Sequence, residues 1–468
     1  MKDEKISAKE LREKLFAQPK HAALRMSDEE IGAAFNWCEG YKSFLSDYRT
    51  EREITAAVQN MAQERGFSEF DPKKKYSAGD KVWFNVKEKA IILTVFGTRP
   101  LSDGVKIAAA HIDSPRLDVK PNPMYEDCEL ALFKTHYYGG IKKYQWPTVP
   151  LSLHGVIVRA DGSKVTVSIG DKEGEPQFVI SDLLPHLDKN MAERKATDVI
   201  KGEELNVLIG SMPFRSDEGS DLVKLNILKL LNEKYGIVES DFLSAELELV
   251  PAARVSDIGF DRSLIGGYGH DDRVCAYPAL MAAFDCPNPS YTTVTVLTDK
   301  EEIGSTGNTG LSSAYLQFFV DDLARTQGLE GRDVLRVSEC LSADVNAGVD
   351  PTFQSVHDKL NASFVNRGIV VTKYTGSRGK SDTSDANAEF VGKMRKLFDD
   401  SDIVWQIGEL GKVDEGGGGT VAKYVAHLGV DVVDVGVPVL SMHAPFEQIA
   451  KLDIYMAYKA FCVFYDQK

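Results

Sequence analysis

The chain has 468 residues, and its 70 acidic residues exceed its 55 basic residues, giving a net charge of −15. This length allows more than one domain, and the acidic balance disfavours nucleic acid and anionic membranes as partners. No apolar run reaches membrane-spanning length, the charged start Met1–Lys5 lacks an export signal, and the six cysteines are scattered without a CxxC pair. We therefore expect a cytoplasmic protein with reduced thiols and with no nucleic-acid or membrane partner.

Helical periodicity extends over residues 7–65, and strand-like runs follow at 90–96 and 106–112. Residues 118–251 differ, because short alternating segments such as 149–158 and 164–169 end in turns, which is typical of an antiparallel β-rich module. From residue 257 onward, apolar strands alternate with helical patterns, as in a parallel sheet with crossover helices. The sequence predicts an α/β fold in which residues 1–118 and 254–468 form one domain and the β-rich residues 119–253 are inserted.

The first candidate site residues in chain order end the strand at 106–112. His111 can bind a metal, and Asp113, two positions on in an extended segment, can orient a ligand or a neighbouring base. Asp271 comes later, at the start of an expected helix over 274–284, where a helix N-cap is the structural alternative.

Two adjacent carboxylates, Glu301 and Glu302, follow the apolar run 291–297. A pair of charges at the end of a buried strand is unfavourable unless the charge is used. A metal-assisted hydrolase uses such a pair, because one carboxylate binds a cation and its neighbour takes a proton from the attacking water. A solvated acidic turn is the alternative interpretation of the pair alone.

Two further apolar runs precede a candidate ligand. Asp344 follows an expected strand at 334–337, and His443 follows the run 435–442. Each of these residues taken singly is more often structural than catalytic. Together with His111, Asp271 and Glu302 they lie at or beside the ends of separate strands, where ligands gather in an open α/β sheet. The sequence therefore predicts one shared site.

The blocks HIDSP, GHDDR, DKEEIGS, SADVNAGVDP and SMHAPFE, in that order, closely resemble the signature blocks of the aspartyl aminopeptidase and aminopeptidase I family. The resemblance covers nearly the whole chain. It implies a zinc-exopeptidase-type mixed sheet with helices on both faces, and a dimerisation role for the inserted domain. It also implies a metal-dependent aminopeptidase that removes N-terminal residues from peptides and assembles from dimers into a tetrahedral homododecamer.

The resemblance further implies a role for each residue of the predicted site. His111 and Glu302 would each bind one of two zinc ions, and Asp271 would bridge the two. Asp344 and His443 would complete the two ligand sets. Glu301 matches the general base, and Asp113 matches the residue that orients His111. Cobalt or manganese would be able to replace zinc, since oxygen-rich dinuclear sites discriminate poorly between these ions.

Three other features are expected near the site. Gly419 and Thr420 end a glycine run that enters a helix, and they resemble the loop that borders the substrate in the family. His186 is, on its residues alone, a helix-end histidine, whereas the resemblance implies a histidine that reaches the active site of the neighbouring subunit. His270 departs from the family pattern and is expected either to support the site or to be exposed.

Two other functions stay open on the sequence. One is another hydrolase with the same dinuclear core, such as a carboxypeptidase or an amide deacylase. The other is a catalytically silent assembly protein. The order and wording of the blocks weigh against the first, and the presence of all five ligands with Glu301 and Asp113 weighs against the second.

Overall fold

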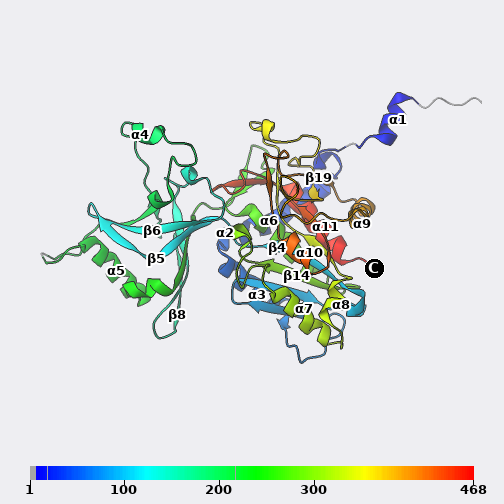
Figure 1. Cartoon of the computed structure of the whole chain (residues 1–468), viewed down its shortest axis with the longest axis horizontal. Coiled ribbons are helices and arrows are strands. Elements are labelled where there is room, and N and C mark those ends of the chain that lie inside the picture. The colour runs from blue at the N-terminus through cyan, green and yellow to red at the C-terminus, as the bar shows by residue number, and fades with distance from the viewer. Residues whose placement is uncertain (1–6, 18, 217) are drawn as a thin grey trace, which may run out of the picture.

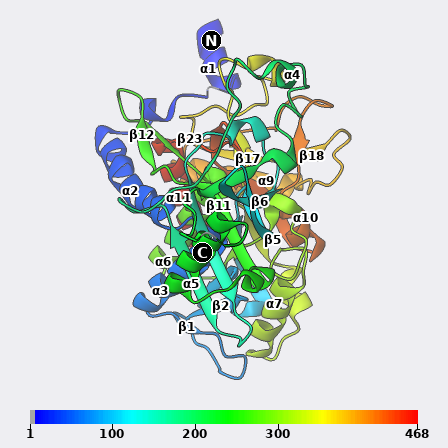
Figure 2. The same ribbon diagram turned by 90° about the vertical axis from the view of Figure 1, so that its left-hand side faces the viewer.

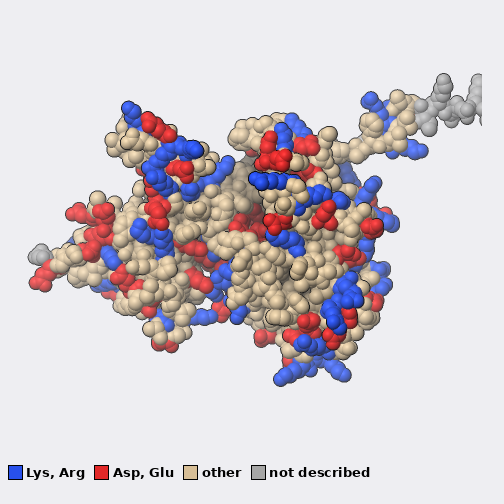
Figure 3. Space-filling model, in the orientation of Figure 1, with Lys and Arg blue, Asp and Glu red and all other residues tan. Residues whose placement is uncertain are grey.

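The computed structural model describes residues 7–17, 19–216 and 218–468, so the charged start Met1–Lys5 lies outside the described residues. Two lobes lie side by side, a β-rich lobe on the left of Figure 1 and a larger α/β lobe on the right. Basic and acidic side chains are interspersed over the face seen in Figure 3. Within the described residues, no helix combines the length and apolar character needed to cross a membrane.

A nine-stranded mixed sheet forms the centre of the α/β lobe. Its strands, in spatial order, are β1 (Ser68–Glu69), β2 (Lys81–Val86), β3 (Ala90–Val95), β14 (Thr292–Thr298), β4 (Val105–His111), β15 (Glu339–Ser342), β21 (Asp431–Gly436), β17 (Ile369–Thr372) and β19 (Trp405–Ile407). The four central strands β14, β4, β15 and β21 are mutually parallel. Their carboxyl ends therefore lie at the same edge of the sheet.

Helices cover both faces of this sheet, as predicted. One face packs against α2 (Asp28–Asp47), α3 (Glu51–Glu64), α6 (His270–Asp285), α9 (Ala388–Asp400) and α11 (Lys451–Tyr465). The other face packs against α7 (Tyr315–Arg325), α8 (Gly331–Leu335) and α10 (Ala422–His427). Strand β4 shows the alternation that this requires, because Ala108 and Ala110 join the first core and Ile107 and Ala109 the second. The short helix α1 (Ala8–Leu15) projects from this lobe (Figure 1).

The helical prediction for residues 7–65 is confirmed over α1, α2 and α3, and is wrong for the described residues between α1 and α2, which hold only the 3-10 turn Ala22–Leu24, and for the break between α2 and α3. Thr50 ends the break, because its side chain accepts the N–H of Glu53 while Glu53 accepts the N–H of Thr50. The strand expected at 334–337 is wrong. Val334 and Leu335 belong to α8 and pack beside α7, and the strand before Asp344 is β15. A short apolar run fits a buried helix turn as well as a strand, so periodicity cannot separate the two.

The β-rich lobe is a seven-stranded antiparallel sheet built from residues 116–251. Its strands, in spatial order, are β8 (Lys164–Ile169), β7 (Leu151–Val158), β11 (Ala245–Pro251), β5 (Arg116–Asp127), β6 (Leu130–Tyr138), β10 (Asn206–Gly210) and β9 (Val179–Ile180). Helix α5 (Leu222–Tyr235) packs on this sheet, as Figure 2 shows from the lobe's own side, and α4 (Lys189–Ala192) lies at its upper end (Figure 1). The antiparallel prediction for this region is confirmed.

Two smaller sheets complete the α/β lobe. The five-stranded one contains β12 (Ser256–Ile258), β13 (Leu264–Gly267), β23 (Glu447–Ala450), β22 (Pro438–Leu440) and β16 (Asn346–Ala347), in that spatial order. The two-stranded one pairs β18 (Gly376–Ser377) with β20 (Gly417–Gly418). Both sheets contribute residues to a single cavity at the carboxyl edge of the nine-stranded sheet.

Candidate active site

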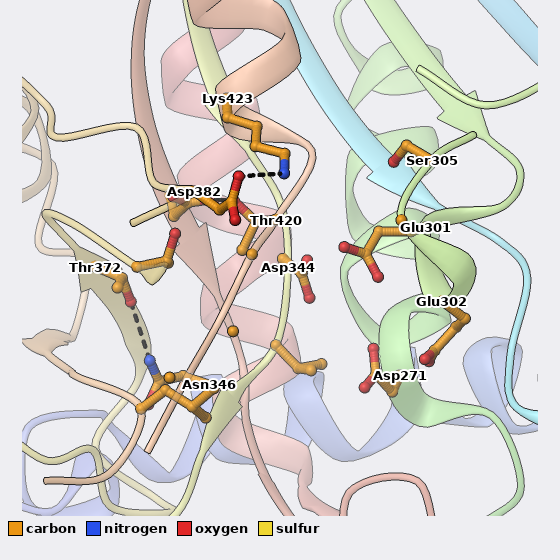
Figure 4. Close-up of a pocket in the computed structure, with 18 of the residues that line it drawn as sticks. Asp271, Glu301, Glu302, Ser305, Asp344, Asn346, Thr372, Asp382, Thr420 and Lys423 are labelled. Carbon is orange, nitrogen blue, oxygen red and sulfur yellow. Dashed lines mark hydrogen bonds and ion pairs between the residues drawn. The ribbon is translucent and has the colours of Figure 1, made fainter. Parts of the chain in front are cut away.

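The cavity has a volume of about 480 Å³ and gathers residues that are far apart in the sequence. His111 ends β4, Glu301 and Glu302 lie in the turn after β14, and Asp344 follows β15. Because these strands are parallel neighbours, their carboxyl ends deliver the side chains to one place. Figure 4 shows Asp271, Glu301 and Glu302 on one side of the cavity and Asp344 facing them.

Asp271 lies at the centre of this group, at the start of α6. One oxygen of its carboxylate is 3.2 Å from Nε2 of His111, and the other is 3.2 Å from Nε2 of His443. Nε2 of His443 is also 3.4 Å from Oε2 of Glu302. The structure thus brings the predicted residues His111, Asp271, Glu302 and His443 into mutual contact. Each oxygen of the Asp271 carboxylate faces a different histidine.

Asp113 is buried beside His111 and fixes the turn that carries the two glutamates. Its carboxylate accepts the backbone N–H of Glu301 at 3.1 Å and that of Glu302 at 3.2 Å. Nδ1 of His111 lies 3.0 Å from the Asp113 backbone carbonyl and 3.3 Å from its carboxylate. Donation from Nδ1 leaves Nε2 of His111 free to face Asp271.

Glu301 points into the cavity without being fastened. Its Oε2 lies 4.0 Å from Nε2 of His111, and no hydrogen bond from the described residues holds its carboxylate. Burial, with the charges of Asp113 and Asp271 adding to it, raises the pKa of Glu301 to about 7. A carboxylate with this pKa can take up and release a proton near neutral pH.

The donor set fits a metal site. His111, Asp271 and Glu302 each offer an atom within 4.8 Å of one another, as do His111, Glu301 and Asp344. Oε1 of Glu302 is buried and has no hydrogen-bond partner among the described residues. Burial raises the pKa of Glu302 and of Asp344 well above the ordinary value, and the charges of the neighbouring carboxylates raise both further. Bound cations would neutralise this charge.

Some functional contacts were not predicted. Glu447, in β23, accepts the N–H of Asp271 at 3.1 Å and the N–H of His443 at 2.7 Å, so one side chain fixes two others. Its position in the block SMHAPFE was the signal that would have found it. His270 is fully buried, with Nδ1 2.7 Å from the Tyr41 hydroxyl, and burial lowers its pKa to about 3. The exposed alternative for His270 is therefore wrong.

The predicted substrate loop borders the cavity. Gly419 and Thr420 both line it, but the Thr420 hydroxyl donates to the buried Asp434 at 2.8 Å and holds the loop in place. Lys423 and Asp382 form an ion pair of 3.5 Å at the rim, drawn in Figure 4. His186 is exposed on the β-rich lobe and is not among the described residues that line the cavity of its own chain.

Comparisons with known proteins agree with this site. The family model for the aminopeptidase I zinc metalloproteases (M18) matches residues 44–465. A probable M18 family aminopeptidase 1 of Borrelia garinii is 48% identical over 452 residues, covering 95% of this chain and 98% of that protein. The crystal structure of an M18 family aminopeptidase from Thermotoga maritima matches with a TM-score of 0.91 at 42% identity, covering 97% of this chain and 100% of that one. The Saccharomyces cerevisiae mApe1 dodecamer structure shares the fold at 18% identity, with a TM-score of 0.73 and coverage of 92% and 96%.

These matches confirm the α/β fold. They do not favour the two alternatives, which were another dinuclear hydrolase, such as a carboxypeptidase or deacylase, and a silent assembly protein. Because the identity is high over almost the full length of both proteins, the activity and the metal of the family are assigned to this chain together with the fold. The chain therefore belongs to the aminopeptidase I (M18) family of zinc metalloproteases, and it is a zinc-dependent aminopeptidase.

Proposed function

We propose that this aminopeptidase works through two zinc ions that share Asp271. His111 and Asp344 would complete the ligands of one ion, and Glu302 and His443 those of the other. The placement of Asp271 carries this proposal, because its two carboxylate oxygens each lie 3.2 Å from a different histidine. Zinc bound to these donors would lower the pKa of a bound water and polarise the substrate carbonyl.

The protein's own groups do the proton transfer. Glu301 is free in the cavity, beside His111, and would take the proton from the attacking water. It would then give the proton to the amine that leaves when the peptide bond breaks. Asp113 keeps Glu301 and Glu302 at fixed positions through the backbone of their turn, so that base and ligand cannot drift apart.

The substrate would be a peptide with a free N-terminus. The α-amine is basic, and it would bind one of the zinc ions or a nearby carboxylate of the acidic cavity wall. A cavity of about 480 Å³ has room for the first few residues of a peptide. Gly419 and Thr420 would border the bound peptide from the opposite loop.

Measurement of zinc content together with hydrolysis of matched peptides tests the proposal. We expect two zinc ions per chain, and we expect cleavage of free-amine peptides without cleavage of their N-acetylated forms. One zinc ion per chain, or equal cleavage of both peptide forms, would contradict it.

We further propose that residues 119–253 form a dimerisation domain, that residues 1–118 and 254–468 form the catalytic domain, and that dimers assemble into a tetrahedral homododecamer. The dodecameric yeast structure supports this, since it shares the fold. So do the exposed apolar side chains of the β-rich lobe, which include Leu183, Leu184, Leu187, Met212, Phe214, Leu225, Leu230 and Leu243. His186 lies among three of these leucines and would reach the active site of the partner subunit, where it would donate a hydrogen bond to the substrate carbonyl.

A further inference from the structure

Three consecutive residues at the end of β6, Tyr138, Gly139 and Gly140, bring the β-rich lobe into contact with the candidate active site. The Tyr138 hydroxyl donates to Oδ2 of Asp113 at 2.8 Å. The same carboxylate accepts the backbone N–H groups of Glu301 and Glu302. Tyr138 therefore fixes the carboxylate that fixes the turn carrying the base and a ligand.

Tyr138 is itself held rigidly. Its side chain is 7% exposed, and the guanidinium of Arg116, its partner across the β5–β6 ladder, lies 3.9 Å from the ring centroid. Arg116 forms ion pairs of 3.4 Å with Glu51 of α3 and 3.2 Å with Glu248 of β11. Because α3 belongs to the α/β lobe and β11 to the β-rich lobe, the tyrosine is fixed at the junction between the lobes.

Gly140 holds the opposite side of the same site. Its carbonyl oxygen accepts a hydrogen bond from Nδ1 of His443 at 2.9 Å. In neutral His443, a proton held on Nδ1 would leave Nε2, which lies beside Asp271 and Glu302, available to bind a metal ion. A backbone carbonyl of the β-rich lobe thus selects the tautomer that a metal ligand requires.

Gly139 lies directly against Glu302. It has φ of +76°, and a Cβ atom built there would be 3.3 Å from both Cβ and Oε2 of Glu302. The contact is tight, so any side chain at this position would push on the glutamate. The three residues together touch Asp113, Glu302 and His443.

We propose that Tyr138–Gly140 is a positioning segment through which the β-rich lobe sets the geometry of the zinc site. Of its three residues only Gly140 lines the cavity, and the segment acts on the site through Asp113, Glu302 and His443. The role rests on the proposed assignment of Glu302 and His443 as ligands. It makes the β-rich lobe part of the catalytic unit, in addition to any part in assembly.

Tyr138→Phe tests the segment most gently, because the ring and its contact with Arg116 stay and only the hydroxyl is lost. We expect zinc affinity, measured by competition with a chelator, to fall about 10- to 100-fold, as for other partners of metal ligands. With saturating zinc, kcat should fall and KM should stay within about twofold, because substrate contacts are unchanged. Tyr137→Phe is the matched control, since Tyr137 is the preceding residue, is 39% exposed and points to the other face of the strand. It should match wild type.

Gly139→Ala tests the contact with Glu302, with Gly162→Ala as its control. Both glycines have positive φ, +76° and +83°, so both substitutions carry similar backbone strain. A Cβ at Gly162 meets nothing within 4 Å, whereas one at Gly139 meets Glu302. We expect at least a tenfold loss of zinc affinity for Gly139→Ala alone, with the thermal midpoints of the two zinc-free variants alike.

The outcomes separate the two proposals. If wild-type protein binds no zinc tightly, or if Glu302→Ala and His443→Ala bind zinc as wild type does, the ligand assignment fails and this role fails with it. If those two variants lose zinc but Tyr138→Phe binds it with wild-type affinity and turns over at the wild-type rate, only the positioning role is overturned. Should Gly139→Ala not fold, Tyr138→Phe decides the matter.

Discussion

Asp113 shows how a side chain that neither binds substrate nor reacts can determine a site. It is fully buried, and its carboxylate receives the N–H groups of Glu301 and Glu302 and the hydroxyl of Tyr138. Burial raises the pKa of Asp113, but the hydrogen bond and charge of His111 and the Tyr138 hydroxyl outweigh it and hold that pKa below its usual value. The turn after β14 consequently has one stable position.

The freedom of the Glu301 carboxylate gives the first prediction. Glu301→Gln keeps the shape of the side chain and removes its ability to accept a proton. Zinc content should stay at the wild-type value, and kcat should fall by about 10²- to 10⁴-fold. Metal analysis and steady-state kinetics on one preparation check both parts. A variant with near-normal turnover would show that another group is the base.

A second prediction separates ligands from other acidic residues of the cavity. Asp344→Ala and His443→Ala should each lose zinc as well as rate, because each removes a proposed ligand. Asp382→Asn is the control, since Asp382 lies at the exposed rim and pairs with Lys423 rather than with the proposed ligands. Full zinc content in the alanine variants would remove Asp344 and His443 from the ligand set.

The sequence indicated the residues at strand ends better than those that support them. His111, Glu302 and Asp344 could be predicted to meet, because each follows an apolar run that reads as a strand or lies just beyond one. Glu447 and Tyr138 could not. Their contacts with Asp271 and Asp113 join positions 176 and 25 residues apart, the first between a strand and a helix and the second between a strand and a loop. No local pattern records which strand will lie against which.

At the scale of elements, the parallel strands β14, β4 and β15 explain why the site forms where it does. Their order in space differs from their order in the chain, and the two crossovers between them include α6, α7 and α8. The alternation of strands and helices after residue 257 therefore predicted the type of sheet. It did not predict that β17 would run antiparallel to β21, because the direction of a strand in the sheet depends on packing rather than on sequence period.

The junction between α3 and the β-rich sheet gives a pH-dependent prediction. His154 of β7 lies 2.7 Å from Glu53 of α3 and 3.0 Å from Asp171, which also pairs with Arg49 at 3.4 Å. Burial lowers the pKa of His154, but contacts with Asp171 and Glu53 outweigh it and raise the pKa to about 9. The folded value lies above the unfolded value of about 6.5, so charged His154 stabilises the fold fully below pH 6.5.

This stabilisation should be lost as the pH rises through about 9. Wild type should therefore exceed His154→Gln in free energy of unfolding by on the order of 2 kcal/mol near pH 6.5, with a smaller difference near pH 9.5. Urea unfolding midpoints of both proteins at three pH values measure the trend. A difference independent of pH would mean that His154 is neutral in the folded protein.

At the scale of the whole molecule, the exposed leucines of the β-rich lobe belong to the proposed dimer contact. Mixing inactive His186→Ala subunits with inactive Glu301→Gln subunits tests whether His186 acts across that contact. Hybrid dimers contain one site with both residues, so activity should return on mixing if His186 acts in the partner's site. Light scattering gives the mass in the same experiment. A monomer with full activity, or no recovery from mixed oligomers, would contradict the trans role.

The sequence also did not predict which apolar residues lie on the surface of the β-rich lobe. Antiparallel strands were evident from turns and alternation, but exposed Leu225 and Leu230 on α5 look like ordinary core positions until the helix is placed. Which apolar residues face outward depends on the packing of the whole lobe.

The order of the site residues along the chain has a consequence for the time at which cleavage can begin. His111 is synthesised early, yet Asp271, Asp344, His443 and Glu447 follow over more than three hundred further positions, and α11 must still pack against α6. A growing chain on the ribosome therefore lacks a complete active site. Nearby free N-termini are therefore not cleaved by this chain until its later ligands have been synthesised and have folded into place. Ribosome-stalled chains that stop before residue 443 should accordingly hydrolyse no peptide, and activity from such a stalled chain would contradict this.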